Sequence, residues 1–245
     1  MDYVDRMFGR QQAVNLDNVF KFTDLSPTVQ KHLQKVYLTL TCALLAATVG
    51  VVVSVFTGIG GLLTMLGFMG CVFGLLALQP TPQNLNKRYL LLAGAAFCQG
   101  CSLGPLISLV LATQPGVLLT ALLGTCLVFA CFSGAAMISR RRSYLFLGGT
   151  LSSAMSLMLV LRLGSWLFGG RALVFQAELY GGLLIFMGYV LFDTQMIIEK
   201  AYRGEKDHVK HALDLFVDFG AIFVRLLIIL MKNAEKREQD KRRRR

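Results

Sequence analysis

Residues 36–56 read VYLTLTCALLAATVGVVVSVF and contain no Asp, Glu, Lys or Arg. A helix of this length spans about 30 Å, the thickness of the hydrocarbon core of a bilayer. Six further apolar segments follow, at residues 62–78, 89–111, 117–137, 144–161, 173–192 and 215–231. Lipid offers the backbone no hydrogen-bond partners, so each segment has to satisfy its own peptide groups as a helix. The sequence therefore predicts an all-α membrane protein, folded as a seven-helix bundle.

The composition excludes a soluble globular protein. Of the 245 residues, 55% are hydrophobic and only 16% are charged, against about 25% charged in an average soluble domain. The net charge of +11 comes from Lys and Arg beside the apolar segments, which favours anionic lipid headgroups over nucleic acid as partners. We therefore expect the lipid bilayer around residues 27–231, and no nucleic-acid binding.

The flanking charges predict how the segments are oriented. Five Lys or Arg residues precede residue 36, two lie in 79–88, three in 140–142 and four in 193–214, whereas the opposite connections carry only Arg162 and Arg171. By the positive-inside rule the richer side is the cytosol, which makes residues 1–26 a cytosolic N-terminal tail. Residues 232–245 carry eight more basic residues and are predicted to be a basic cytosolic tail. With both termini in the cytosol, segment seven is either re-entrant or spans against the charge rule.

Ionisable residues inside the apolar segments are candidates for function, because charges at membrane depth are costly. Asp193 ends segment six, and Asp218 and Arg225 lie within segment seven. Asp214, Asp218 and Arg225 fall within about 40° of one helix face, so that face is predicted to be a supporting polar face. Asp218 and Arg225 are two turns apart, too far for direct contact. We therefore expect Asp193 to be the partner of Asp218, with a structural ion pair as the alternative.

Two carboxyl groups in contact inside a bundle cannot both ionise cheaply, so they are expected to share a proton and titrate as one unit. This predicts a pH-sensitive latch. When ionised, the pair can hold calcium only transiently, because two carboxylates fall short of the six to eight ligands that calcium takes. No tightly bound metal and no cofactor are expected.

Three other titratable residues have weaker assignments. His208 and His211 precede segment seven and are possible modulators of the latch, because histidine titrates between pH 5 and 8; solvated loop histidines are the alternative. Glu178 lies near the start of segment six, where we expect it to reach the membrane interface.

Several stretches of the sequence resemble one known family. They are SPTVQKHL at 26–33, Gly104 followed by Pro105, RRRSYLFLGG at 140–149, FDTQMIIEK at 192–200 and DLFVDF at 214–219. In this combination the chain resembles the Bax inhibitor-1 family, its plant-like members most closely, from about residue 25 to the basic tail.

The resemblance implies a cytoprotective protein of the endoplasmic reticulum membrane that suppresses programmed cell death and leaks calcium in a pH-dependent way. It also implies a bundle in which the last helix is central among the other six. By motif, the paired-aspartate sensor of the family falls on Asp193 and Asp218. Calcium is then a permeant ion, and cell-death regulators and other membrane proteins are further candidate partners.

Two alternatives belong to other functional classes. One is a non-conducting interaction protein that binds cell-death regulators. The other is an intramembrane aspartyl protease, in which two membrane aspartates act as acid and base; its Gly-x-Gly-Asp and Pro-Ala-Leu signatures are missing around Asp193 and Asp218. We therefore expect no enzymatic activity.

The basic tail is the last predicted site. Its end is expected to bind anionic lipids through five consecutive residues, Lys241, Arg242, Arg243, Arg244 and Arg245.

Overall fold

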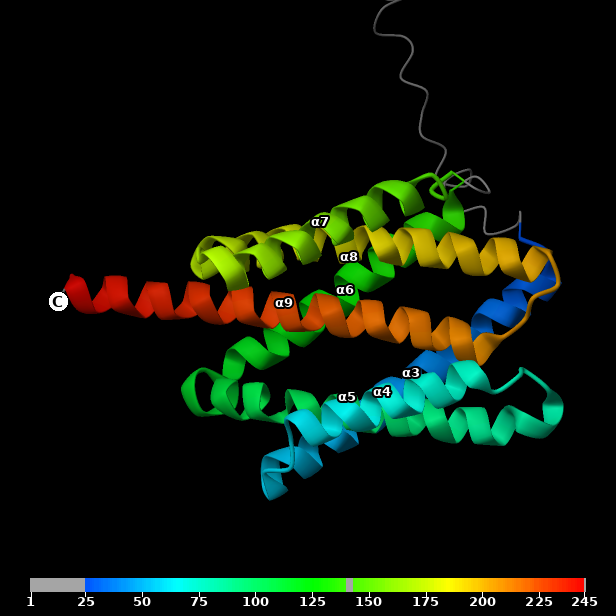
Figure 1. The fold of residues 1–245 in the computed structure, drawn as a ribbon, viewed down its shortest axis with the longest axis horizontal. Helices are drawn as coiled ribbons and strands as arrows, with labels where there is room; N and C mark the ends of the chain where they lie inside the picture. The colour runs from blue at the N-terminus through cyan, green and yellow to red at the C-terminus, as the bar shows by residue number, and fades with distance from the viewer. Residues whose placement is uncertain (1–24, 140–142, 245) are drawn as a thin grey trace, which may run out of the picture.

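The computed structural model describes residues 25–139 and 143–244, and in these ranges it contains helices and no strand (Figure 1). The elements are α3 (Pro27–Thr57), α4 (Leu62–Ala77), the short 3₁₀ turn η2 (Pro82–Asn84), α5 (Leu85–Thr113), α6 (Pro115–Ile138), α7 (Leu147–Phe168), α8 (Arg171–Tyr202) and α9 (His208–Arg243). The predicted all-α bundle of seven long helices is confirmed within the described residues.

The helix ends follow local sequence signals. Ser26 caps α3, because its Oγ accepts a hydrogen bond from the backbone N–H of Val29 and Pro27 occupies the first turn. The helix ends at Gly58, whose φ of 72° is left-handed and suits glycine. At α9, the Asp207 side chain caps the helix by accepting from the N–H of Lys210.

Five stretches are helical, long and apolar enough to cross a membrane: Pro27–Thr57, Pro82–Thr113, Pro115–Ile138, Leu147–Leu167 and Arg171–Tyr202. The chain is therefore a multi-pass membrane protein. α4 is shorter, with 16 residues. α9 is not among the five, since Asp214, Asp218 and Arg225 interrupt its apolar stretch.

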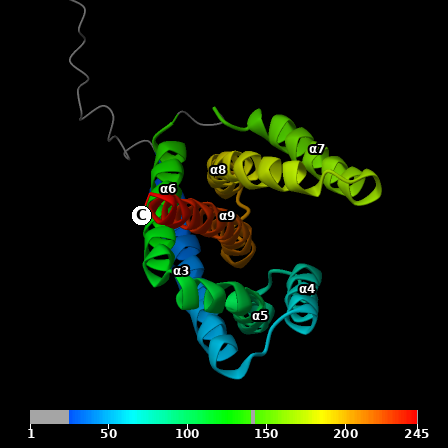
Figure 2. The same cartoon turned by 90° about the vertical axis from the view of Figure 1, so that its left-hand side faces the viewer.

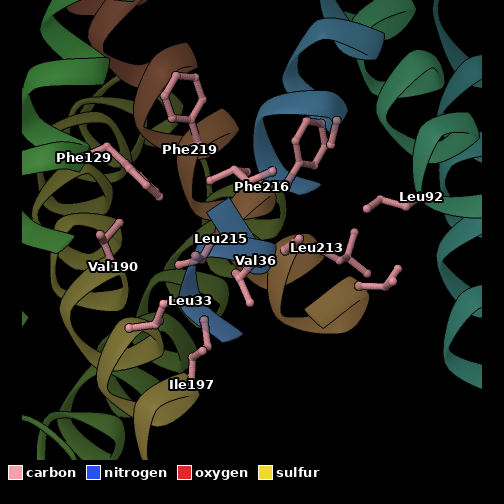
Figure 3. Close-up of a cluster of buried hydrophobic side chains, with 14 of the residues drawn as sticks. Leu33, Val36, Leu92, Phe129, Val190, Ile197, Leu213, Leu215, Phe216 and Phe219 are labelled. Atoms are coloured by element: carbon pink, nitrogen blue, oxygen red, sulfur yellow. The ribbon is translucent and has the colours of Figure 1, made fainter. Parts of the chain in front are cut away.

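α9 is the centre of the bundle. It packs against α3, α5, α6 and α8, and the end-on view in Figure 2 shows it among these helices, with α4 and α7 further out. Figure 3 shows the core around it: Leu33 and Val36 of α3, Phe129 of α6 and Val190 of α8 lie around Leu215 and Phe219 of α9. Since lipid gives helices no hydrophobic drive to associate, this contact depends on close van der Waals packing.

The tightest packing joins α3 and α5. A Cβ atom built on Gly100 would lie 2.0 Å from the carbonyl oxygen of Ala47, and one built on Gly50 would lie 2.2 Å from that of Phe97. Only glycine permits the two backbones to approach this closely.

Segment seven lies within one continuous helix. α9 is an unbroken helix of 36 residues, about 54 Å long at 1.5 Å per residue, and it contains no proline. Figure 1 shows it running from the end of the bundle where α3 begins to the opposite end, where the C-terminus lies. The choice between a re-entrant and a spanning segment, and the side of the membrane that each end faces, stay predictions.

Candidate functional site

Asp193 of α8 and Asp218 of α9 meet inside the bundle. Their carboxyl groups are close enough to interact electrostatically, and Asp218 is 4% exposed while Asp193 is half-buried. A hydrogen bond between two carboxyl groups requires that one of them carries a proton. The expected contact between the two aspartates is therefore present in the structure.

The short connection between α8 and α9 explains why these two residues meet. The helices are antiparallel neighbours joined by residues 203–207. Asp193 lies nine residues before the last residue of α8, Tyr202, and Asp218 lies ten residues after the first residue of α9, His208. Nearly equal distances from one turn place the two side chains at the same level of the helix pair.

Few charges offset this acidic contact. Asp214, one turn before Asp218, acts electrostatically on both aspartates, and Lys200 acts on Asp193 and Asp214. In the part of the chain that the structure describes, Asp193 and Asp218 form no ion pair, and Oδ2 of Asp218 has no hydrogen-bond partner. Within the same residues, no group of three or more His, Cys, Asp or Glu side chains could hold a metal ion.

Arg225 does not support the aspartate pair, contrary to the predicted polar face. Its Nη1 donates to the carbonyl oxygen of Ala221 at 3.0 Å and its Nε to that of Glu178 at 3.5 Å, and the guanidinium lies 4.5 Å from the ring centre of Phe186. Two helical turns, about 10.5 Å, separate it from Asp218 along α9. Of the predicted supporting residues, only Asp214 lies beside the pair.

Glu178 is not simply an interfacial residue. Its carboxylate lies 3.6 Å from Nη1 of Arg162 in α7, and its side chain is 21% exposed. Glu178, Arg162 and Arg225 line one cavity of about 260 Å³ between α7, α8 and α9. A second polar site therefore lies further along the same helix pair.

The start of α9 carries a polar network that includes the predicted modulators His208 and His211. His211 is buried and its Nδ1 lies 3.0 Å from Nε2 of the buried His32 in α3. His208 is partly buried, with its Nε2 2.6 Å from the hydroxyl of Tyr89 in α5. Neither is a solvated loop histidine, and both bind α9 to its neighbours.

An ion pair completes this network. Arg88 of α5 donates two hydrogen bonds of 2.7 Å to the two carboxylate oxygens of Asp207. Partial burial acts to raise the pKa of Asp207, but the hydrogen bonds from Arg88 and from the Lys210 N–H outweigh it and hold the pKa below its usual value. The sequence does not reveal this pair, because Arg88 and Asp207 lie 119 residues apart.

The sequence comparisons decide the family. A model described as inhibitor of apoptosis-promoting Bax1 matches residues 29–235. Bax inhibitor 1 of Arabidopsis thaliana is 47% identical over 241 residues, covering 97% of both chains. Bax inhibitor 1 of Bos taurus is 46% identical over 232 residues, covering 94% of this chain and 98% of its own. Bax inhibitor 1 of Oryza sativa subsp. japonica is 45% identical, covering 93% of this chain and 90% of its own.

The chain belongs to the Bax inhibitor-1 family. The names of these relatives describe a family role in suppressing cell death. The match includes α8, α9 and their aspartate contact.

The basic tail of this family member is helical almost to its end. Lys241, Arg242 and Arg243 form the last turn of α9, Arg244 follows it, and all four are exposed. Arg245 lies outside the described residues, as do residues 1–24 of the predicted N-terminal tail and the basic connection at 140–142.

Proposed function

We propose that this protein suppresses programmed cell death from the membrane of the endoplasmic reticulum by acting as a pH-sensitive calcium leak channel, with Asp193 and Asp218 as its latch. The proposed role is not enzymatic and needs no bound cofactor, since calcium is the permeant ion. We place the start of α3 on the cytosolic side, where the charge distribution favours it. Lipid and cell-death regulators are the proposed partners.

The contact between Asp193 and Asp218 carries this proposal. It joins the central helix, α9, to its neighbour α8, so a change there alters the packing of the core. With one shared proton the contact holds the two helices together. When that proton is lost, two negative charges face each other at a cost of roughly 4 kcal/mol for charges about 4 Å apart at an effective dielectric constant of about 20.

Loss of the proton therefore favours separation of α8 and α9. The same event makes the carboxylate oxygens ligands for a hard cation. Among the described residues, Oδ2 of Asp218 has no hydrogen-bond partner that would compete with the cation. Water would complete the calcium shell, which suits a transient site in a leak path.

The basic end of α9 supports a second element of the proposal. Each of Lys241, Arg242, Arg243 and Arg244 is exposed and contributes about 1 kcal/mol at an anionic surface. We propose that this tail, including Arg245, holds the end of the central helix at anionic lipids.

Calcium efflux from liposomes that contain only the purified protein tests the latch. We expect the leak to increase with pH between about pH 5 and 8, the range in which a shared carboxyl pair titrates. Asp193→Asn and Asp218→Asn should each lose most of this dependence. Asp240→Asn is the matched control, because Asp240 is exposed on the same helix, α9.

The same assay distinguishes the interaction protein. Wild-type protein that gives no leak in liposomes, yet protects cells, would reject the channel and support a non-conducting partner of cell-death regulators. A wild-type pH profile in both correctly folded aspartate variants would reject the latch and leave the leak in place.

A further inference from the structure

A basic cavity lies at the end of the bundle where α3 begins. It has a volume of about 250 Å³, and its lining includes Lys31 and Lys35 of α3, Lys206 from the connection between α8 and α9, and His32 and His208. No carboxylate is among its lining residues, which all belong to the described part of the chain. The cavity is at the opposite end of α9 from the basic tail.

The basic side chains line one cavity from two directions of the chain. Lys31 and Lys35 are four residues apart, so they share one face of α3. Lys35, Lys206 and His208 each lie close enough to His32 to act on its charge, and Asp207 acts on it with the opposite sign. None of the three lysines forms an ion pair with any described residue.

The nearest carboxylates do not neutralise the cavity. Asp207 follows Lys206, but Arg88 already engages both of its oxygens at 2.7 Å. Glu205 precedes Lys206 and is exposed, and it does not line the cavity. No carboxylate among residues 25–139 and 143–244 therefore compensates the three ammonium groups at this cavity.

The start of α3 adds to this field. Pro27 and Thr28, at the first turn of the helix, also line the cavity. The N-terminus of a helix carries about half a positive charge, which favours a bound anion. The lysines add mobile ammonium donors, which bind phosphate as point charges.

We propose that this cavity binds a phosphate monoester, held by Lys31, Lys35 and Lys206 at the first turn of α3. Lys31 and Lys35 immediately precede the apolar segment that begins at residue 36, which places the cavity at headgroup depth. The ligand is then either the headgroup of a phosphomonoester lipid or a soluble phosphomonoester, and both present the same dianionic group.

Binding of the anion should also stabilise the contact between α3 and α9. His32 lines the cavity and is within 3.0 Å of His211 on α9, and His208 belongs to both the cavity and α9. An anion that bridges Lys31 and Lys35 to Lys206 would tie the start of α3 to the start of α9. Because it binds only the folded chain, it should raise the temperature of unfolding.

The thermal unfolding midpoint of the purified full-length protein is the readout. The soluble probe is glycerol phosphate added to protein in neutral detergent. The lipid probes are phosphatidylcholine nanodiscs that contain phosphatidic acid, a phosphomonoester, or phosphatidylserine, a phosphodiester. A shift with glycerol phosphate and phosphatidic acid identifies the shared group, and a shift with phosphatidic acid alone identifies the lipid as the source.

Variants then locate the site. Lys31→Gln, Lys35→Gln and Lys206→Gln should each weaken binding about fivefold, and the triple variant roughly a hundredfold, from about 1 kcal/mol per basic residue. The matched control is Lys87→Gln, because Lys87 is exposed at the start of α5 and does not line the cavity. Lys206 is exposed in a connection, so the single Lys206→Gln variant tests the site even if the triple variant fails to fold.

Three outcomes would overturn the proposal. They are the absence of any shift with phosphatidic acid and glycerol phosphate, an equal shift with phosphatidylserine, and equal weakening by Lys206→Gln and Lys87→Gln. The second and third would show that net charge alone attracts the anion.

Discussion

Two polar sites lie along the pair of helices α8 and α9. One brings together groups of the same charge, and the other brings together groups of opposite charge. Near the connection, Asp193 of α8 meets Asp218 of α9, two groups of the same sign. Further along, Arg225 of α9 lies against α8 beside Glu178, which pairs with Arg162. The first contact exists in only one protonation state, whereas the second consists of opposite charges that attract in their ordinary states.

The two sites therefore differ in whether their contacts depend on pH. Arg225 stays protonated at any physiological pH, and the carbonyl oxygens of Ala221 and Glu178 satisfy its donors together with the ring of Phe186. The aspartate pair has no such fixed partners among the described residues. Sensitivity to pH should therefore belong to one part of the α8–α9 interface and be missing from the other.

The largest expected effect concerns the side of the membrane that the end of α9 faces. Charge counting places both termini in the cytosol, and a protease treats a tag on either side in an all-or-none way. In sealed microsomes, we expect added protease to digest a tag at residue 1 and a tag after residue 245. Protection of the tag after residue 245 would show that α9 crosses the membrane from one end of the bundle to the other.

The next effect is on the pH profile of the calcium leak. Asp218→Asn keeps the shape of the side chain and one hydrogen-bond partner but removes the shared proton. The difference in leak rate between about pH 5 and 8 should then fall to within about twofold. Glu178→Gln, in the opposite-charge site, should keep the wild-type pH dependence, and a flat profile in that variant would show that the two sites are not separate.

A third prediction concerns the stability that the ion pair between Arg88 and Asp207 contributes at the start of α9. Arg88→Gln should lower the free energy of unfolding by about 3 kcal/mol at neutral pH, because it removes one partner of a largely buried pair in which Arg88 is 3% exposed.

The pH dependence of that loss has a definite sign. The pKa of Asp207 is lowered in the folded protein, so the stability from this pair is present above the unfolded pKa of about 3.9 and is lost as the pH falls through the folded value. The difference in the free energy of unfolding between wild type and Arg88→Gln should therefore become smaller below about pH 4. A constant difference, measured by unfolding in detergent, would show that packing rather than charge accounts for it.

The smallest effect is expected at the opposite-charge site. Arg225→Met should lower the free energy of unfolding by about 2 kcal/mol, because it removes hydrogen bonds to a charged group, and should leave the shape of the leak profile unchanged. Arg162→Met is the control: its side chain is 73% exposed, so its loss should cost less. An equal cost for both variants would mean that the Arg225 contacts add nothing beyond a surface charge.

Much of the fold was predictable because lipid imposes strict rules on sequence. Segment length and apolar composition predict the helices closely, since each helix in lipid has to be long, apolar and internally hydrogen-bonded. The contact of Asp193 with Asp218 was also within reach, because a short connection places residues equally distant from it at one level.

The path of α9 was left open by the sequence. Charge counting favours a re-entrant segment because eight basic residues follow residue 231, whereas the length of the apolar segment favours a span. The structure adds that the helix continues through residue 231 to Arg243 and packs on four neighbours, which local composition does not specify.

By itself, then, the sequence determined the membrane class, the helices and the aspartate pair, all of which follow from local composition or from one short turn. The tertiary structure alone decided the partner of His211, which is 179 residues away in His32, the partner of Asp207 in Arg88, and the turn of α8 that Arg225 faces. These contacts depend on how helices distant in the chain rotate and stack against one another. No single segment carries that information, because the final packing is a property of all the helices together.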